Sequence, residues 1–293
     1  ALDNAISGDT VWIKNDSTYE MDGVDQQAAA FDVDVDNNIE IKGFKSNIGD
    51  CDEGGTYYQD TTDGYAIIDA KSGAFDVFDA GDFDYLRWHN IKIVNSNQNA
   101  FNLTPTTDKL AYLLDNCWVG GVGTSGKAVS SNYVNGAKLY RCIIEGSFST
   151  SPIAGAVFFS ASSYSPVIAQ CVFNITGAER AVYYSGTGMM VLDGCIFNIA
   201  DVDSQVIRIS NPAVIKNNVI CNSGEEVFDG IKVYSGGKGA RVYNNIIAGV
   251  NNSILDGDTY CYYIDHNDFY DCSANPTIGN NNITANPQFV DAA

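Results

Sequence analysis

The apolar residues of this chain recur in one short pattern, apolar-x-x-Z-x-apolar, where Z is Cys, Asn or an apolar residue. Only the first segment lacks the closing apolar residue. The segments are IKGFKS (41–46), WHNIKI (88–93), LDNCWV (114–119), LYRCII (139–144), IAQCVF (168–173), LDGCIF (192–197), IKNNVI (215–220), VYNNII (242–247) and IDHNDF (264–269). Short segments that return along the whole chain predict an architecture built from repeated units.

The spacing of the Z residues gives the length of the unit. The Z positions are Phe44, Ile91, Cys117, Cys142, Cys171, Cys195, Asn218, Asn245 and Asn267. Neighbouring Z residues lie 22 to 29 residues apart, except for a first gap of 47 residues, which is close to two units. We therefore expect one further rung between Phe44 and Ile91, together with a loop around Cys51.

Each unit also holds short β-rich runs separated by Gly, Asn and Ser. Examples are AVFF (156–159), AVYY (181–184), VIRI (206–209) and IKVY (231–234). Helical repeats need units of about 33 to 47 residues and an apolar period of about 3.6, and neither occurs here. The pattern predicts an all-β, single-stranded parallel β-helix of about nine to ten coils.

The Φ-x-x-[NC]-x-Φ repeats resemble those of the right-handed parallel β-helix proteins of the pectate-lyase-like superfamily. The opening ALDNAISGDTVWIKNDSTYEM is similar to their first coil, so the resemblance implies a right-handed solenoid with an N-terminal cap. We expect the cap and first coil over 1–30, and one continuous β-helix over 31–293 with a loop excursion at about 46–65. This superfamily includes lyases, hydrolases, epimerases, phage tailspikes and inert surface proteins, so the resemblance implies a fold without selecting one activity.

The Z residues are expected to stack inside the solenoid, one above another at the strand spacing of about 4.8 Å. The three Asn would then form a ladder of side-chain amides, and the four Cys would continue it as small buried apolar groups. Zinc ligands converge on one point, whereas these Cys lie one coil apart on parallel vectors. A disulfide between Cys261 and Cys272 is left open.

The stretch AFDVDVDNNIEIKG (30–43) has two interpretations. Asp32, Asp34 and Asp36 match the first ligands of an EF-hand loop, but Gly43 stands where that loop needs a bidentate Glu. With a period of two, the same residues form a strand whose valines face inward and whose aspartates face solvent. We favour the strand and keep Ca²⁺ as the alternative cofactor.

The formal net charge of −20, from 36 acidic and 16 basic residues, changes which partners are expected. Nucleic acid and anionic membranes need basic surfaces, so we expect neither as a partner. No run of about 18 apolar residues is present, and membrane insertion is not expected. The start at Ala1 and the apolar pair near the end are interpreted as trimming of a longer precursor.

Alignment of the middle strands on Val182, Ile207 and Ile231 places Tyr183, Arg208 and Lys232 in one outward column. An aromatic and basic column fits a polysaccharide contact, or a lyase site that needs a base and a cation beside the uronate carboxylate. Exposed Lys and Arg are also common on the solvent face of any strand. These residues are the candidates for ligand binding and, more weakly, for catalysis.

The position after Z is apolar in six successive units. It is occupied by Trp118, Ile143, Val172, Ile196, Val219 and Ile246. If Z points inward, this column points outward and exposes more apolar surface than a monomer normally does. We expect an interface and self-association; the alternative is that the turn rotates the column into the core.

Two functions remain. The preferred one is a non-enzymatic structural or adhesive module of a virion, filament or cell surface, able to bind a glycan and to self-associate. In its favour, catalytic signatures are missing and only His89 and His266 occur as histidines. The alternative is an extracellular polysaccharide lyase or hydrolase, which the net charge disfavours because a polyanionic substrate would be repelled.

Overall fold

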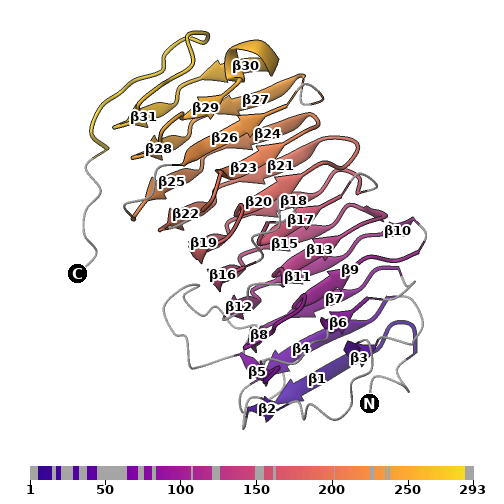
Figure 1. The fold of residues 1–293 in the computed structure, drawn as a ribbon. Helices are drawn as coiled ribbons and strands as arrows, with labels where there is room; N and C mark the ends of the chain where they lie inside the picture. Colours follow the sequence, from indigo (N-terminus) through magenta and orange to yellow (C-terminus); the bar gives the residue numbers. More distant parts are fainter. Residues whose placement is uncertain are drawn as a thin grey trace.

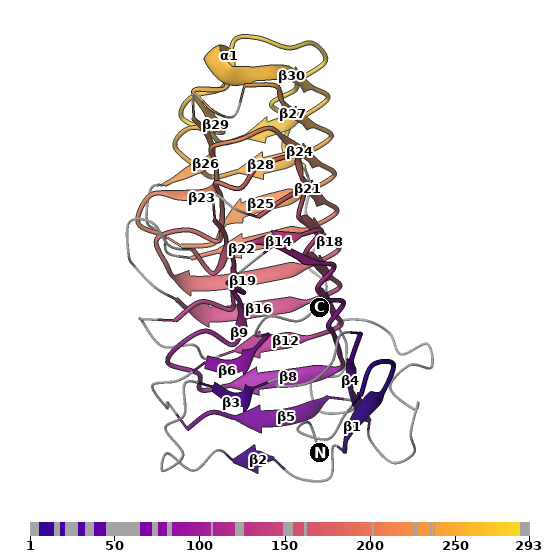
Figure 2. The same ribbon diagram turned by 90° about the vertical axis from the view of Figure 1, so that its right-hand side faces the viewer.

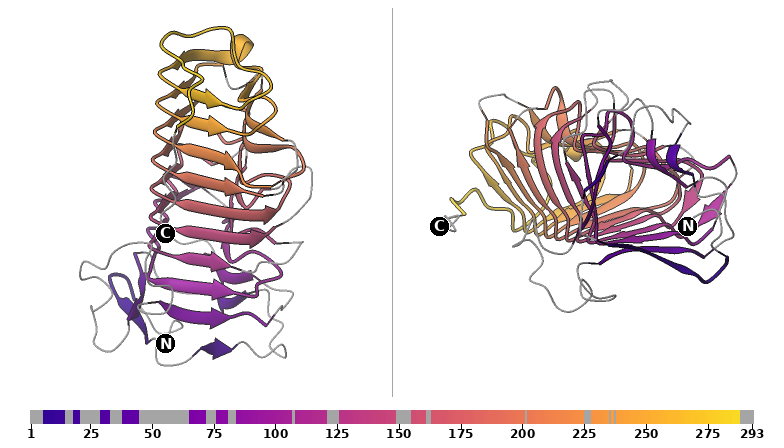
Figure 3. Two further views of the ribbon diagram at one scale, coloured as in Figure 1. Left: turned by 90° about the vertical axis from the view of Figure 1, so that its left-hand side faces the viewer. Right: turned by 90° about the horizontal axis from the view of Figure 1, so that it is seen from below.

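The computed structural model is a parallel β-solenoid, in which the chain winds in successive coils (Figure 1). Buried apolar side chains fill its interior. The structure describes residues 6–14, 18–20, 29–32, 38–44, 65–71, 76–80, 84–106, 108–120, 126–148, 155–160, 163–200, 202–224, 228–234, 236 and 238–287. Within these residues, three long sheets run the length of the molecule, and successive coils lie over one another when the solenoid is seen from below (Figure 3). The prediction of an all-β parallel solenoid is confirmed; its handedness and N-terminal cap stay predictions.

Sheet A contains ten strands in the described part of the chain. They are β1 (Thr10–Lys14), β4 (Glu40–Phe44), β7 (Arg87–His89), β11 (Leu113–Asp115), β15 (Lys138–Tyr140), β18 (Val167–Ala169), β21 (Met190–Asp193), β24 (Ala213–Lys216), β27 (Ala240–Tyr243) and β30 (Cys261–Asp265).

Sheet B also contains ten described strands, and Figure 2 shows many of them stacked along the molecule. They are β2 (Tyr19–Glu20), β5 (Ala66–Asp69), β8 (Ile91–Val94), β12 (Trp118–Gly120), β16 (Ile143–Ser147), β19 (Val172–Gly177), β22 (Ile196–Ile199), β25 (Val219–Asn222), β28 (Ile246–Ala248) and β31 (Asp268–Tyr270).

Sheet C contains nine described strands. They are β3 (Ala29–Asp32), β6 (Asp76–Asp79), β9 (Phe101–Leu103), β13 (Val129–Ser131), β17 (Val157–Phe159), β20 (Val182–Tyr184), β23 (Gln205–Ile209), β26 (Asp229–Val233) and β29 (Ile254–Leu255). A small parallel pair, β10 (Lys109–Leu110) and β14 (Val134–Asn135), and the short helix α1 (Gly257–Tyr260) complete the described elements.

A two-residue turn joins sheet A to sheet B in most coils. Its first residue has a positive φ, for example 50° at Asn116, 55° at Arg141 and 57° at Asn217. Asn adopts this left-handed conformation more readily than most residues with a Cβ. The second residue of the turn is Z, which the turn directs into the solenoid.

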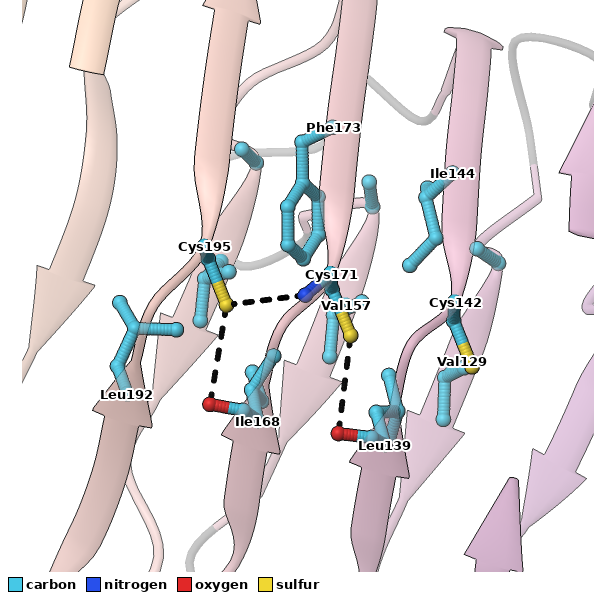
Figure 4. Packing of buried hydrophobic residues seen from close by; sticks show 14 of the residues in the cluster. Val129, Leu139, Cys142, Ile144, Val157, Ile168, Cys171, Phe173, Leu192 and Cys195 are labelled. Carbon is cyan, nitrogen blue, oxygen red and sulfur yellow. Dashed lines mark hydrogen bonds between the residues drawn. The ribbon is translucent and has the colours of Figure 1, made fainter. Parts of the chain in front are cut away.

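The Cys part of the Z column is a stack of buried free thiols. Cys117, Cys142, Cys171 and Cys195 are at most 2% exposed. Figure 4 shows the Cys195 thiol near the backbone N–H of Cys171, with an N to Sγ distance of 3.4 Å. The predicted stacking is confirmed. Cys261 and Cys272 are also free thiols, so the disulfide left open above does not form.

The Asn part of the column forms the expected ladder. The Asn218 amide donates to Oδ1 of Asn245 at 3.0 Å, and the Asn245 amide donates to Oδ1 of Asn267 at 2.9 Å. The ladder extends one rung further, because the Asn267 amide donates to Asn282 Oδ1 at 3.1 Å. A buried amide that donates and accepts satisfies neighbouring backbone groups as well as its own.

The expected extra rung between Phe44 and Ile91 is wrong. Strand β4 pairs directly with β7, with Ile41 opposite Trp88, so no strand of sheet A lies between them. The partner of Ile91 is Ala66, which is fully buried, and Phe44 instead ends β4 in a half-buried position. The long first gap is therefore one coil with extra residues between its strands in sheets A and B. The predicted loop at 46–65 lies almost entirely outside the described residues.

Candidate functional site

Tyr183, Arg208 and Lys232 lie in one column of sheet C. Tyr183 of β20 pairs with Arg208 of β23, and Arg208 pairs with Lys232 of β26. The predicted common column is therefore confirmed, because Val182, Ile207 and Ile231 all turn into the core and fix the register. The role of the three residues in binding or catalysis stays a prediction.

The guanidinium of Arg208 lies between two tyrosine rings. Its Cζ is 4.8 Å from the ring centroid of Tyr183 and 4.1 Å from that of Tyr234. Stacking on aromatic faces holds a guanidinium in place while leaving its N–H groups free to donate in the plane of the group. The Arg208 Nε is buried and has no hydrogen-bond partner among the described residues.

A second arginine lies beneath the same ring. Arg180 Cζ is 5.6 Å from the Tyr183 centroid, and the Arg180 side chain is only 4% exposed. It forms an ion pair with Glu179 at 2.7 Å and donates from Nε to Gln205 at 3.3 Å. Burial lowers the pKa of Arg180 and Glu179 opposes this shift. The guanidinium of Arg180 is therefore fixed beside Arg208.

Lysines border the two arginines on either side. Lys232 Nζ lies 5.2 Å from the Tyr234 centroid and forms an ion pair with Asp256 at 2.9 Å. On the other side, Lys127 Nζ lies 5.4 Å from the centroid of Phe158, whose ring packs 5.3 Å from that of Tyr183.

Four of the 16 basic residues of the chain thus share one face with three aromatic rings. We call this group, Lys127, Phe158, Arg180, Tyr183, Arg208, Lys232 and Tyr234, the basic-aromatic cluster.

The column of sheet C that contains Tyr183, Arg208 and Lys232 becomes acidic toward the N-terminal end of the solenoid. Asp79 of β6 pairs with Asn102 of β9, and the Asn102 amide donates to an Asp79 oxygen at 3.3 Å. The backbone of Asp32 pairs with that of Asp79, which agrees with the strand interpretation for that residue. Asp34 and Asp36 lie outside the described residues. Among the residues that are described, no group of three or more His, Cys, Asp or Glu side chains could hold a metal ion.

The apolar stripe predicted as an interface lies on sheet B. Its residues pair in register from strand to strand, and the flanking Cys117 and Val119 are buried. Ile196 is 48% exposed, so the alternative that the turn rotates the column into the core is wrong there. Trp118 differs from the expectation, since it is 5% exposed beneath Lys92, whose Nζ lies 3.2 Å from the ring centroid.

Sequence reasoning found only part of the basic-aromatic cluster. Phe158 occupies the position of Tyr183 one coil earlier, in AVFF, and this alignment could have identified it. Arg180 and Tyr234 flank the aligned strands, and their contact with Arg208 depends on how the chain leaves each strand, which a repeat pattern does not encode.

No helix in the described part of the chain is long and apolar enough to cross a membrane. The chain matches no known family model, no curated protein and no solved structure.

Proposed function

We propose that the protein is a non-enzymatic adhesive module that binds an acidic glycan through the basic-aromatic cluster on sheet C. The observation that carries the proposal is the Arg208 guanidinium, which is stacked between the rings of Tyr183 and Tyr234 in the column of sheet C. A guanidinium fixed in this way can bind a carboxylate or sulfate with two parallel hydrogen bonds. Because its position is already set by the rings, little side-chain entropy is lost on binding.

The net charge of −20 does not exclude an anionic ligand at this face. In about 0.15 M salt the screening length is about 8 Å, so acids on other faces act weakly at the cluster. Two acids beside the cluster are already paired, Glu179 with Arg180 and Asp256 with Lys232. Lys127 also faces the carboxyl group of Asp76, so we assign the anionic ligand to Arg208.

A rigid solenoid that presents one binding face suits a surface-exposed module. The coils stack directly on one another, so side chains in one column recur at about 4.8 Å. Two coils span about 10 Å, a length comparable to two sugar residues of an extended chain. We therefore propose an extracellular location, on a virion, filament or cell surface, as the setting for this binding.

Titration calorimetry with polygalacturonate, alginate and heparin tests the proposal. Arg208→Ala removes the stacked guanidinium and should weaken binding about 10- to 100-fold, since hydrogen bonds to charged groups contribute about 1.5 to 3 kcal/mol. Arg208→Lys keeps the charge but loses the two-pronged geometry, and should also weaken binding. The matched control is Lys138→Ala, an exposed lysine of β15 on sheet A. Equal affinity of the Arg208→Ala and control variants would refute the proposal.

Lyase activity, the alternative function, is tested in the same samples. Elimination from a uronan produces an unsaturated sugar that absorbs in the ultraviolet. Absorbance that grows with the wild type and not with Arg208→Ala or Lys232→Ala would replace the adhesive module by an enzyme. Calorimetric binding without growing absorbance supports the proposal.

A further inference from the structure

The outward column on sheet B continues beyond the apolar stripe in both directions. In register, Lys92 precedes Trp118 and Asp268 follows Ile246. This part of the column is Lys92, Trp118, Ile143, Val172, Ile196, Val219, Ile246 and Asp268. It has a cation at one end, an anion at the other and six apolar residues between them, and beyond them Ile67 pairs with Lys92 and Ile283 with Asp268.

At the acidic end of the column, Asp268 is incompletely matched by the described residues. One carboxylate oxygen of Asp268, Oδ1, is buried and accepts no hydrogen bond from any described residue. Burial raises the pKa of this carboxyl group, although the backbone N–H of Ala285 opposes the shift. A cation brought close to Asp268 from outside the chain would favour the charged carboxylate and so oppose the effect of burial.

We propose that a second copy of this chain covers the column in antiparallel orientation, about a two-fold axis that lies between β19 and β22. Reversing the order of the column places Lys92 of one copy against Asp268 of the other. Apolar residues then meet in the middle of the column, with Ile143 against Val219 and Val172 against Ile196, while Ile246 meets Trp118 and the Lys92 side chain that covers it. A two-fold interface requires such self-complementarity.

The ends of the column select the orientation. A dimer with the two columns running in the same direction would place Lys92 against Lys92 and Asp268 against Asp268. Like charges brought together in an interface disfavour that arrangement. The antiparallel arrangement converts both contacts into ion pairs.

The size of the face indicates the strength of the contact. Eight rungs at about 4.8 Å extend over about 34 Å, and strands of three to six residues give a width of about 10 to 20 Å. Such a strip, of about 340 to 680 Å², is smaller than the ~800 Å² per partner of a standard interface. We therefore expect a concentration-dependent dimer that dissociates on dilution into the micromolar range.

Disulfide trapping tests the orientation. The neighbouring outward column runs through Glu145, Asn174, Asn198 and Cys221. In the antiparallel dimer, position 145 of one copy lies opposite Cys221 of the other. Within one chain these positions are three rungs apart, about 14 Å, which is too far for a disulfide. Glu145→Cys should therefore give a dimer that forms on mild oxidation and is reversed by reductant.

The double variant Glu145→Cys/Cys221→Ser is the matched control and should remain unlinked. Crosslinking that survives in this variant would overturn the antiparallel arrangement, because it requires another thiol pair. Absence of crosslinking in Glu145→Cys at concentrations where the wild type is dimeric would overturn it as well.

Sedimentation velocity of the wild type and of Ile196→Lys tests the interface itself. Ile196 is exposed in the single chain, so its replacement should leave circular dichroism and melting temperature nearly unchanged. The lysine would face Val172 of the second copy, and the dimer dissociation constant should rise at least about 10-fold. A wild type that stays monomeric up to about 0.1 mM, well above the concentrations at which micromolar complexes form, would refute the proposal. So would a dimer that Ile196→Lys leaves unchanged.

Discussion

The Asn ladder should contribute more stability per residue than the Cys stack that continues it. Asn245 is 1% exposed, and its Oδ1 accepts from the backbone N–H and the amide of Asn218, both at 3.0 Å. Its amide donates to the backbone carbonyls of Ile215 and Tyr243, also at 3.0 Å. Asn245→Ala therefore removes partners from several buried groups together.

The magnitude follows from the groups left without a partner. The Tyr243 carbonyl keeps a second donor, the backbone N–H of Asn217 at 3.3 Å, but the Asn218 N–H loses the acceptor described above. The Ile215 carbonyl loses the Asn245 amide as a donor. Two buried groups that lose a partner, at about 1 to 3 kcal/mol each, should lower the free energy of unfolding by about 2 to 6 kcal/mol. Cys171→Ala removes one buried sulfur with longer hydrogen bonds, of 3.4 to 3.6 Å, and should cost about 1 to 2 kcal/mol.

Urea unfolding followed by circular dichroism measures both variants against the wild type. Asn245→Cys is the matched replacement, because Cys195 shows that a thiol can accept a backbone N–H from the neighbouring coil. We expect its stability between those of the wild type and Asn245→Ala. If Asn245→Ala costs no more than Cys171→Ala, the reasoning from unpaired buried groups is refuted.

Three further variants or treatments test other parts of the molecule. Phe173→Ala removes a fully buried ring whose centroid lies 4.5 Å from that of Phe197, and it should lower the free energy of unfolding by about 3 to 5 kcal/mol. Phe158 faces outward, so Phe158→Ala should lower it by less. Equal losses would contradict the placement of Phe173 in the core. Burial alone would raise the pKa of Asp115, but hydrogen bonds from His89 and Arg141 outweigh it and lower the pKa, so these contacts stabilise the fold above the unfolded-state pKa of about 4. That stability is lost as the pH falls through the folded-state pKa. Asp115→Asn should therefore lower the free energy of unfolding by about 1 to 3 kcal/mol at pH 7, and by less below about pH 4. If thermal unfolding shows the same destabilisation at every pH, these contacts do not stabilise the charged carboxylate. The strand interpretation of residues 30–43 predicts that a calcium chelator leaves the melting temperature unchanged, and a clear fall would instead indicate a site at Asp32, Asp34 and Asp36.

The column on sheet C could be predicted because its register depends on apolar residues whose side chains must point into the core. Val182, Ile207 and Ile231 must face the core, so the residue after each must face outward. The same logic located the apolar stripe, whose position is fixed by the buried Z residue before it.

The errors arose where the chain departs from the strict repeat. The segment of Phe44 follows the pattern except for its closing residue, Ser46, and the extra residues before Ala66 displace Phe44 from the Z column. Trp118 was expected to be exposed, but Lys92 in the previous coil extends over its ring. Contacts between coils of this kind depend on the length and flexibility of a side chain, which a pattern of apolar positions does not contain.

The stacked Z residues also bear on how a molecule of this kind can change its length. Cys171 and Cys195 are equivalent positions in neighbouring coils and lie 24 residues apart in the chain. The strands on either side of Cys171 pair in register with those on either side of Cys195. Duplication or loss of one complete coil joins equivalent positions and leaves every inward residue facing inward. A change by part of a coil can be accommodated between two strands, as in the long first gap, but it adds no rung to the rod. The length of such a solenoid therefore changes by whole coils, in steps of about 4.8 Å.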